Sequence, residues 1–128
     1  MNNKGFTLVE LLAAVALLAI ISLIITPTIS SVIKNNKIEA CKKLFTSTEQ
    51  AAKNYVSDNR YGTITNMTAS DLITKGYLTG GTVNPLNKTD IKDNIKVTIT
   101  FDTNTKKYTY VTNYSNGGTT KKPEEYCQ

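Results

Sequence analysis

A long apolar segment occupies the amino-terminal part of the chain. From Phe6 to Thr26 the residues are almost all Leu, Ile, Val and Ala, and Glu10 is the one charged residue among them. As a helix rising about 1.5 Å per residue, this segment is about 31 Å long, close to the thickness of a bilayer's hydrocarbon core. A cleavable signal peptide would have a shorter apolar region ending at a small-x-small site, whereas Ala14-Val15-Ala16 lies inside the run. The pattern therefore predicts a membrane-spanning helix.

A helical pattern also continues beyond the apolar run. After Pro27, apolar side chains recur mostly at steps of three or four, as on one face of an amphipathic helix. We expect a single helix that reaches about Asn59, with its back half serving as the spine of a small globular head. The positions that show this spacing are Ile29, Ile33, Ile38, Cys41, Leu44, Phe45, Thr48, Ala52, Tyr55 and Val56.

The next part of the chain predicts a break and a second, short helix. Arg60-Tyr61-Gly62 indicates a helix stop. Residues 68–76 begin with polar capping residues and end in Gly76, which predicts a short helix. Tyr77 and Leu78 follow it, and we expect both to dock on the spine helix.

The last third of the chain predicts a β-meander. Apolar and polar residues alternate in NIKVTITF, residues 94–101, which is the period of a half-buried strand. A turn at 102–105 separates it from a second strand in which tyrosines occupy alternate positions. We expect 115–120 to be a loop and 121–128 a polar tail. The predicted fold class is α+β, with a long amino-terminal helix packed against a small antiparallel sheet.

Composition narrows the function classes. The net charge is +5, and lysines outnumber arginine fourteen to one, which disfavours an Arg-rich surface that grips phosphate. The chain contains no His, so His-ligated metal sites and nucleophile systems that need His are excluded. No spacing brings a nucleophile together with a base. We therefore expect neither enzymatic activity nor a cofactor.

Glu10 needs an explanation of its own. A carboxylate at the centre of a membrane helix costs roughly 2.5 to 3.5 kcal/mol even on lenient insertion scales, but Glu10 lies only about one turn from the start of the helix. There it can lean towards the headgroups and interact with the positive end of the helix dipole. Alternatively, the Glu10 carboxylate pairs with a positive group inside an assembly, where one ion pair fixes the register of the packed helices.

The stretch KGFTLVELL, residues 4–12, resembles the amino-terminal signature of type IV prepilins and of the related pseudopilins. The resemblance implies that a membrane peptidase cleaves between Gly5 and Phe6 and that the new amino terminus on Phe6 is methylated. It further implies that Glu10 pairs with the charged amino terminus of a neighbouring subunit during assembly. Pro27 lies where this family has a helix-kinking proline, so a bend is expected near it.

This resemblance and the patterns above divide the chain into four parts. The first is removed, the second lies in the membrane or in a filament core, the third is the spine and the fourth is the head. Their bounds are 1–5 for the prepilin leader, 6–27 for the hydrophobic helix, 28–60 for the amphipathic spine helix and 61–128 for the globular head with a short helix and a β-meander.

Two cysteines, Cys41 and Cys127, permit one disulfide in an oxidising compartment. Cys41 lies on the apolar face of the spine helix, so a buried free thiol is the alternative. If the head lies outside the cytoplasm, we expect a bridge that fastens the tail to the lower part of the head. Closing a loop of this length contributes at most about 4 to 5 kcal/mol on the chain-entropy model.

Other polar residues carry weaker signals. Asp90, Asp93 and Asp102 have no calcium-loop spacing, and solvated loop charges are the expected reading. The sequons at Asn66 and Asn87, like that at Asn113, are unsurprising in a chain rich in Asn and Thr. For the head's lysines a mixed soluble surface is expected, rather than a site for DNA, lipid or anionic polymers. These lysines are Lys92, Lys96, Lys106, Lys107, Lys121 and Lys122.

The resemblance implies a structural subunit of a type IV pilus-like surface filament. The alternatives are a pseudopilin of a secretion or competence system and, outside the family, a membrane-anchored binding or adhesion module that never polymerises. The implied partners are copies of itself, other pilins, a prepilin peptidase, the pilus assembly machinery and, before assembly, the membrane; no specific nucleic acid is expected. The precursor would be a single-pass membrane protein with its head outside the cytoplasm, and the product an extracellular filament.

Overall fold

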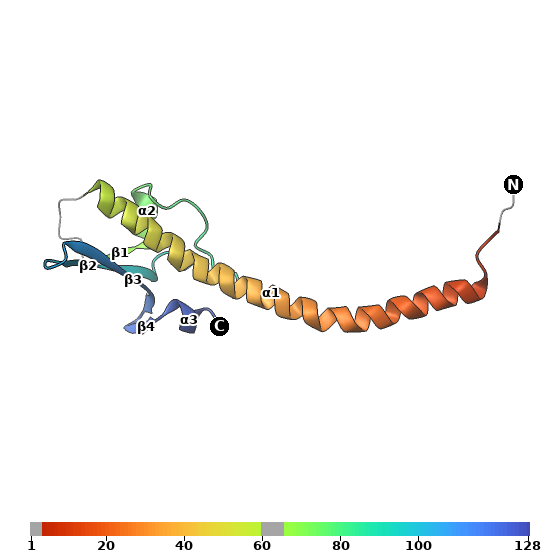
Figure 1. Cartoon of the computed structure of the whole chain (residues 1–128). Coiled ribbons are helices and arrows are strands. Elements are labelled where there is room, and N and C mark those ends of the chain that lie inside the picture. Colours follow the sequence, from red (N-terminus) through yellow and green to blue (C-terminus); the bar gives the residue numbers. More distant parts are fainter. Residues whose placement is uncertain (1–3, 60–65) are drawn as a thin grey trace. The chain divides into compact units, whose positions relative to one another are not determined.

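The computed structural model describes residues 4–59 and 66–128 (Figure 1). The chain forms two compact units, Met1–Asn35 and Asn36–Gln128, and each is described by itself below. The helix stop predicted at Arg60-Tyr61-Gly62 lies outside the described residues.

Helix α1 spans Leu8–Asp58. In the first unit the apolar side chains of α1 are exposed, and no part of the apolar stretch is buried. The length and composition of this helix suffice to cross a membrane. The helix continues through Pro27, whose ring nitrogen donates no hydrogen bond. Just ahead of it, Ser22 Oγ donates to the carbonyl of Leu18 at 2.8 Å and Thr26 Oγ1 to that of Ser22 at 2.6 Å. These hydroxyls are satisfied within the helix, and the bend at Pro27 stays a prediction.

In the second unit one stripe of α1 forms the spine of the head. The buried positions fall at helical spacing, which confirms the periodicity expected from the sequence. The helix ends at Asp58, close to the predicted end. The buried residues of α1 are Cys41, Phe45, Thr48, Ala51, Ala52 and Val56.

A four-stranded antiparallel sheet packs against this stripe, which confirms the α+β fold class. Its strands are β1 (Asn66–Thr68), β2 (Ile95–Asp102), β3 (Lys107–Asn116) and β4 (Thr119–Lys121). They lie side by side in chain order, each antiparallel to the next. On β2, Ile95, Val97 and Ile99 are buried and the residues between them are exposed, as the alternating pattern predicts.

Helix α2 (Ala69–Thr74) follows β1 directly. Thr68 caps it: Thr68 Oγ1 accepts from Asp71 N–H at 3.2 Å, and Thr68 N–H donates to Asp71 Oδ2 at 2.8 Å. Gly76 follows with φ of +79°, a conformation that favours Gly after a helix. Leu72 is fully buried, and Tyr77 and Leu78 pack against the core as expected.

The prediction of a loop at 115–120 was wrong. Ser115 and Asn116 complete β3, and Thr119 and Thr120 pair with them in β4. Only Gly117 and Gly118 form the connection, with φ of +55° and +85°. Two consecutive positive φ values suit the two-residue hairpin turn that matches the twist of the strands, so the Gly pair marks a hairpin.

The carboxyl-terminal segment is also ordered, contrary to the predicted polar tail. Helix α3 spans Pro123–Tyr126. The Tyr126 ring meets the edge of Phe45 with centroids 6.0 Å apart, and Cys127, which follows it, is buried. Alternating polar and apolar positions could not reveal this segment, because only two of its side chains reach the core.

Candidate functional site

The peptide bond between Gly5 and Phe6 lies in an irregular stretch ahead of α1. Both residues are exposed, Phe6 to 92%, and no heavy atom from elsewhere in the chain lies within 4 Å of where a Cβ on Gly5 would be. A peptidase needs an extended, unobstructed backbone to reach a scissile bond. The predicted cleavage position is therefore exposed and unobstructed in the described residues, and cleavage there stays a prediction.

Thr7 and Glu10 form a reciprocal cap at the start of α1. Thr7 N–H donates to Glu10 Oε2 at 3.1 Å, and Glu10 N–H donates to Thr7 Oγ1 at 3.3 Å. The first backbone bond of the helix runs from Leu11 N–H to the Thr7 carbonyl at 3.2 Å. The arrangement is a capping box, which satisfies two of the donors left free at a helix start. The sequence analysis missed Thr7, although Thr-x-x-Glu before an apolar run is the signal for this cap.

The cap places the Glu10 carboxylate in the first turn of α1 and directs it back towards the start of the helix. A negative charge there interacts favourably with the helix dipole. Within residues 4–59 and 66–128, Glu10 has no ion pair, and it is exposed. The carboxylate is therefore available to a cation from outside the chain, at the cost of its bond to Thr7.

The helix behind this cap presents an unpartnered apolar surface. Its large side chains are between 45% and 78% exposed from Leu8 to Ile33. In water such a surface would cause association, whereas in lipid, or against identical helices, it is accommodated. Glu10 is the only acidic residue on this surface before Glu39.

The other predicted site residues lie elsewhere. Cys41 and Cys127 form a disulfide in the structure, 86 residues apart with Cα atoms separated by 5.8 Å. Both are buried, Cys41 on α1 and Cys127 directly after α3. The bridge is far along the chain from Gly5, Phe6 and Glu10, and it serves the head rather than the amino-terminal site.

The three aspartates considered for calcium have no common site. Thr82 Oγ1 donates to Asp90 Oδ1 at 2.6 Å, and Thr105 Oγ1 donates to Asp102 Oδ2 at 2.8 Å; these bonds hold the pKa of each carboxyl below its ordinary value. The part of the chain that the structure describes contains no group of three or more acidic or Cys side chains placed to hold a metal ion. Asp90 and Asp102 instead brace their loops through these bonds, while the Asp93 carboxylate has no hydrogen bond to any of the residues that the structure describes.

Residues 1–26 match the family described as the prokaryotic N-terminal methylation motif. Comparison of the whole chain with curated proteins and with solved structures gave no match. The matched motif implies processing by a prepilin peptidase and assembly with other pilins, and the apolar helix fits a membrane-anchored precursor. The motif match at residues 1–26 supports a type IV pilin-like family for this chain.

Proposed function

We propose that this protein is the structural subunit of a type IV pilus-like surface filament and polymerises through its amino-terminal helix. The observation that carries the proposal is the methylation motif at residues 1–26 at the start of a helix whose apolar stretch has no buried part. Such a helix is stable in a bilayer, and it is equally stable in a bundle of identical helices. The protein acts by assembly rather than catalysis.

Glu10 has two roles in this mechanism. Before assembly its carboxylate accepts the Thr7 N–H bond. During assembly it receives the positively charged amino terminus that cleavage creates on Phe6 of a neighbouring subunit. In a water-free bundle a single ion pair of this kind selects one register among many equivalent apolar packings. The free-energy cost of the Glu10 carboxylate in lipid favours transfer of the subunit from the membrane to the filament.

The proposal is tested with filaments sheared from cells that produce the full chain and imaged by electron microscopy. Glu10→Ala should reduce filament yield at least about tenfold, while mass spectrometry still finds the leader removed and one methyl group added. Glu39→Ala is the matched control, because Glu39 lies exposed on the same helix outside the apolar surface. Normal filaments from Glu10→Ala would overturn the proposal.

Thr7→Val tests the hydroxyl half of the cap separately from the Glu10 carboxylate. It removes the Thr7 Oγ1 acceptor for Glu10 N–H but keeps the carboxylate and the Thr7 backbone N–H that it accepts from, so filaments should persist if assembly depends on the carboxylate. The same images distinguish the alternatives. Short filaments seen only on overproduction indicate a pseudopilin, and processed, methylated protein without filaments indicates a membrane-anchored module.

A further inference from the structure

Strand β3 has one open edge. On one side β2 pairs with β3 along Lys107 to Tyr114. On the other side β4 pairs only with Tyr114 to Asn116. Residues 107–113 therefore have no strand on that side within the described chain.

The backbone groups that face this edge follow from the ladder. Ser115 N–H donates to the Asn94 carbonyl at 2.8 Å, which places this pair at a hydrogen-bonded position facing β2. In an antiparallel pair such positions alternate. The N–H and C=O groups of Tyr108, Tyr110 and Thr112 therefore point away from β2, towards the open edge.

The sequence of this edge favours strand addition. Between Lys107 and Asn113 the residues are Tyr-Thr-Tyr-Val-Thr, which are strong β formers without charge or proline. Natural edge strands are usually protected by a charge, a proline or a bulge in the middle. Here the middle of the edge has none of these, and Val111 is 51% exposed.

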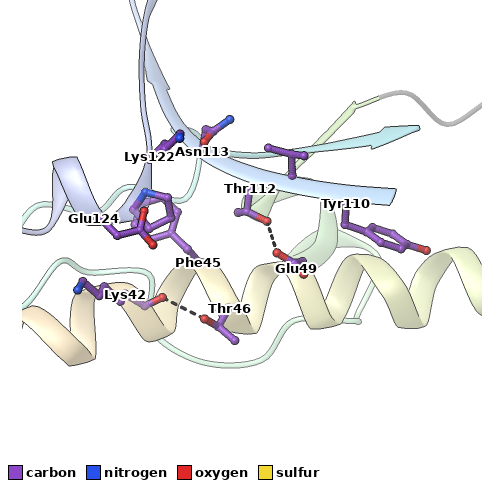
Figure 2. A pocket seen from close by; sticks show the side chains of 11 residues that line it. Lys42, Phe45, Thr46, Glu49, Tyr110, Thr112, Asn113, Lys122 and Glu124 are labelled. Atoms are coloured by element: carbon purple, nitrogen blue, oxygen red, sulfur yellow. Dashed lines mark hydrogen bonds between the residues drawn. The ribbon is translucent and has the colours of Figure 1, made fainter. Parts of the chain in front are cut away.

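The open edge borders a groove of about 480 Å³ (Figure 2). One side of the groove is lined by α1, through Lys42, Thr46 and Glu49, and the other side by β3. Lys122 lines the groove near Asn113, where the carboxyl-terminal segment leaves β4. A second hollow of about 440 Å³ shares Tyr110 and continues along the same strand. The first of these hollows gives an extended segment room beside the edge.

The charges around the groove select its occupant. Glu49 is already engaged, by Lys53 at 2.7 Å and by Thr112 Oγ1 at 3.1 Å. Lys42, Lys122 and Glu124, in contrast, have no ion pair among the described residues, so at this end of the groove two unpaired cations exceed one unpaired carboxylate. These two cations lie at one end of the edge, and a further lysine begins β3 at the other end.

This charge pattern disfavours a second copy of the chain. Antiparallel pairing of two β3 edges about Tyr110 would place Lys107 of one copy beside Asn113 and Lys122 of the other. Like charges facing each other across strands are destabilising. A segment with acidic residues at its ends would meet lysines at both ends instead.

We propose that the β3 edge of the head binds an extended peptide segment of a partner protein by strand addition, with acidic residues flanking an uncharged middle. Main-chain bonds to Tyr108, Tyr110 and Thr112 supply the pairing, and Lys42 and Lys122 supply the charge selection. This mode of recognition combines backbone affinity with side-chain specificity. It does not depend on filament formation, because every group involved belongs to the second unit, Asn36–Gln128.

The test uses the mature full chain in detergent micelles and a fluorescein-labelled peptide of alternating Thr and Val with a glutamate pair at each end. Fluorescence anisotropy should show saturable binding. Lys42→Glu with Lys122→Glu should weaken binding at least about tenfold. Lys96→Glu, on the exposed face of β2, is the matched control and should leave binding unchanged, as should Glu10→Ala.

Two altered probes make the test independent of variant folding. Methylating alternate backbone nitrogens removes the donors that strand addition needs, and replacing the glutamates by lysines reverses the charge. Each probe should bind at least about tenfold more weakly. Equal binding of the methylated probe, an equal effect of Lys96→Glu, absence of binding, or displacement of the probe by self-association of the chain would each overturn the proposal.

Discussion

The ring of Tyr126 stacks on the ring of Tyr114, with centroids 3.9 Å apart and planes 13° from parallel. This stack connects α3 with β3, and the contact of Tyr126 with Phe45 connects α3 with α1. The disulfide at Cys127 fastens the same segment to α1. The tail is therefore held by aromatic packing and by a covalent bond, and the two contributions can be measured separately.

Replacing Cys41 and Cys127 together by Ala should lower the free energy of unfolding of the head. The bridge closes a loop with a sequence separation of 86 residues, for which the chain-entropy model gives at most about 4 to 5 kcal/mol. Urea unfolding of the mature chain in micelles, followed by tyrosine fluorescence, measures the loss. The wild-type protein with reductant should behave like the double variant, and an unchanged midpoint in both would contradict the prediction.

Tyr126→Ala should destabilise the head by about 1 to 3 kcal/mol, because it removes two aromatic pairs that each contribute about 0.5 to 1.5 kcal/mol. Tyr126→Phe keeps both rings and is the matched control. Its free energy of unfolding should stay within about 0.5 kcal/mol of the wild-type value. If Phe costs as much as Ala in the same urea experiment, the stack is not the source of stability.

The helix and central strands were predictable because their patterns are long. The buried stripe of α1 and the alternating residues of β2 each repeat often enough to identify the element and its buried face. The match to the methylation motif likewise depends on adjacent residues. Gly5, Phe6 and Glu10 could therefore be named from sequence alone.

The missed parts are short or depend on partners far away in the chain. Strand β4 has three residues, all exposed, so no alternation marks it, and only the Gly117-Gly118 pair could have indicated the hairpin. Helix α3 has four residues and is placed by Tyr114 and Phe45. The cap at Thr7, in contrast, has a local signal in the sequence, Thr-x-x-Glu before an apolar run.

Thr7→Val should loosen the first turn of α1. It removes the acceptor for Glu10 N–H, and loss of a capping side chain costs about 0.5 to 2 kcal/mol. Hydrogen exchange of the Glu10 amide in micelles should accelerate about fivefold, which corresponds to roughly 1 kcal/mol. Thr7→Ser restores the hydroxyl and should restore protection. Equal exchange in Val and Ser variants would show that the cap does not form in the micelle.

Asp71→Asn should make the head less sensitive to acid. The backbone N–H and the hydroxyl of Thr68 hold the pKa of the Asp71 carboxyl below its ordinary value. A lowered folded-state pKa contributes stability that is present above the ordinary pKa and lost as pH falls through the folded-state value. Wild-type stability should therefore decline between about pH 5 and pH 2, with other carboxyls, including Asp90 and Asp102, adding to the decline.

The comparison that isolates Asp71 is the difference between variant and wild type at each pH. Because Asp71 is exposed, solvent screening limits its contribution to below about 1 kcal/mol. Asp71→Asn should be less stable than wild type near neutral pH, and the gap should narrow in acid. Asp58→Asn is the control, since Asp58 makes no side-chain hydrogen bond or ion pair within the described residues. A gap for Asp71→Asn that is independent of pH would mean that the charge of Asp71 does not stabilise the cap.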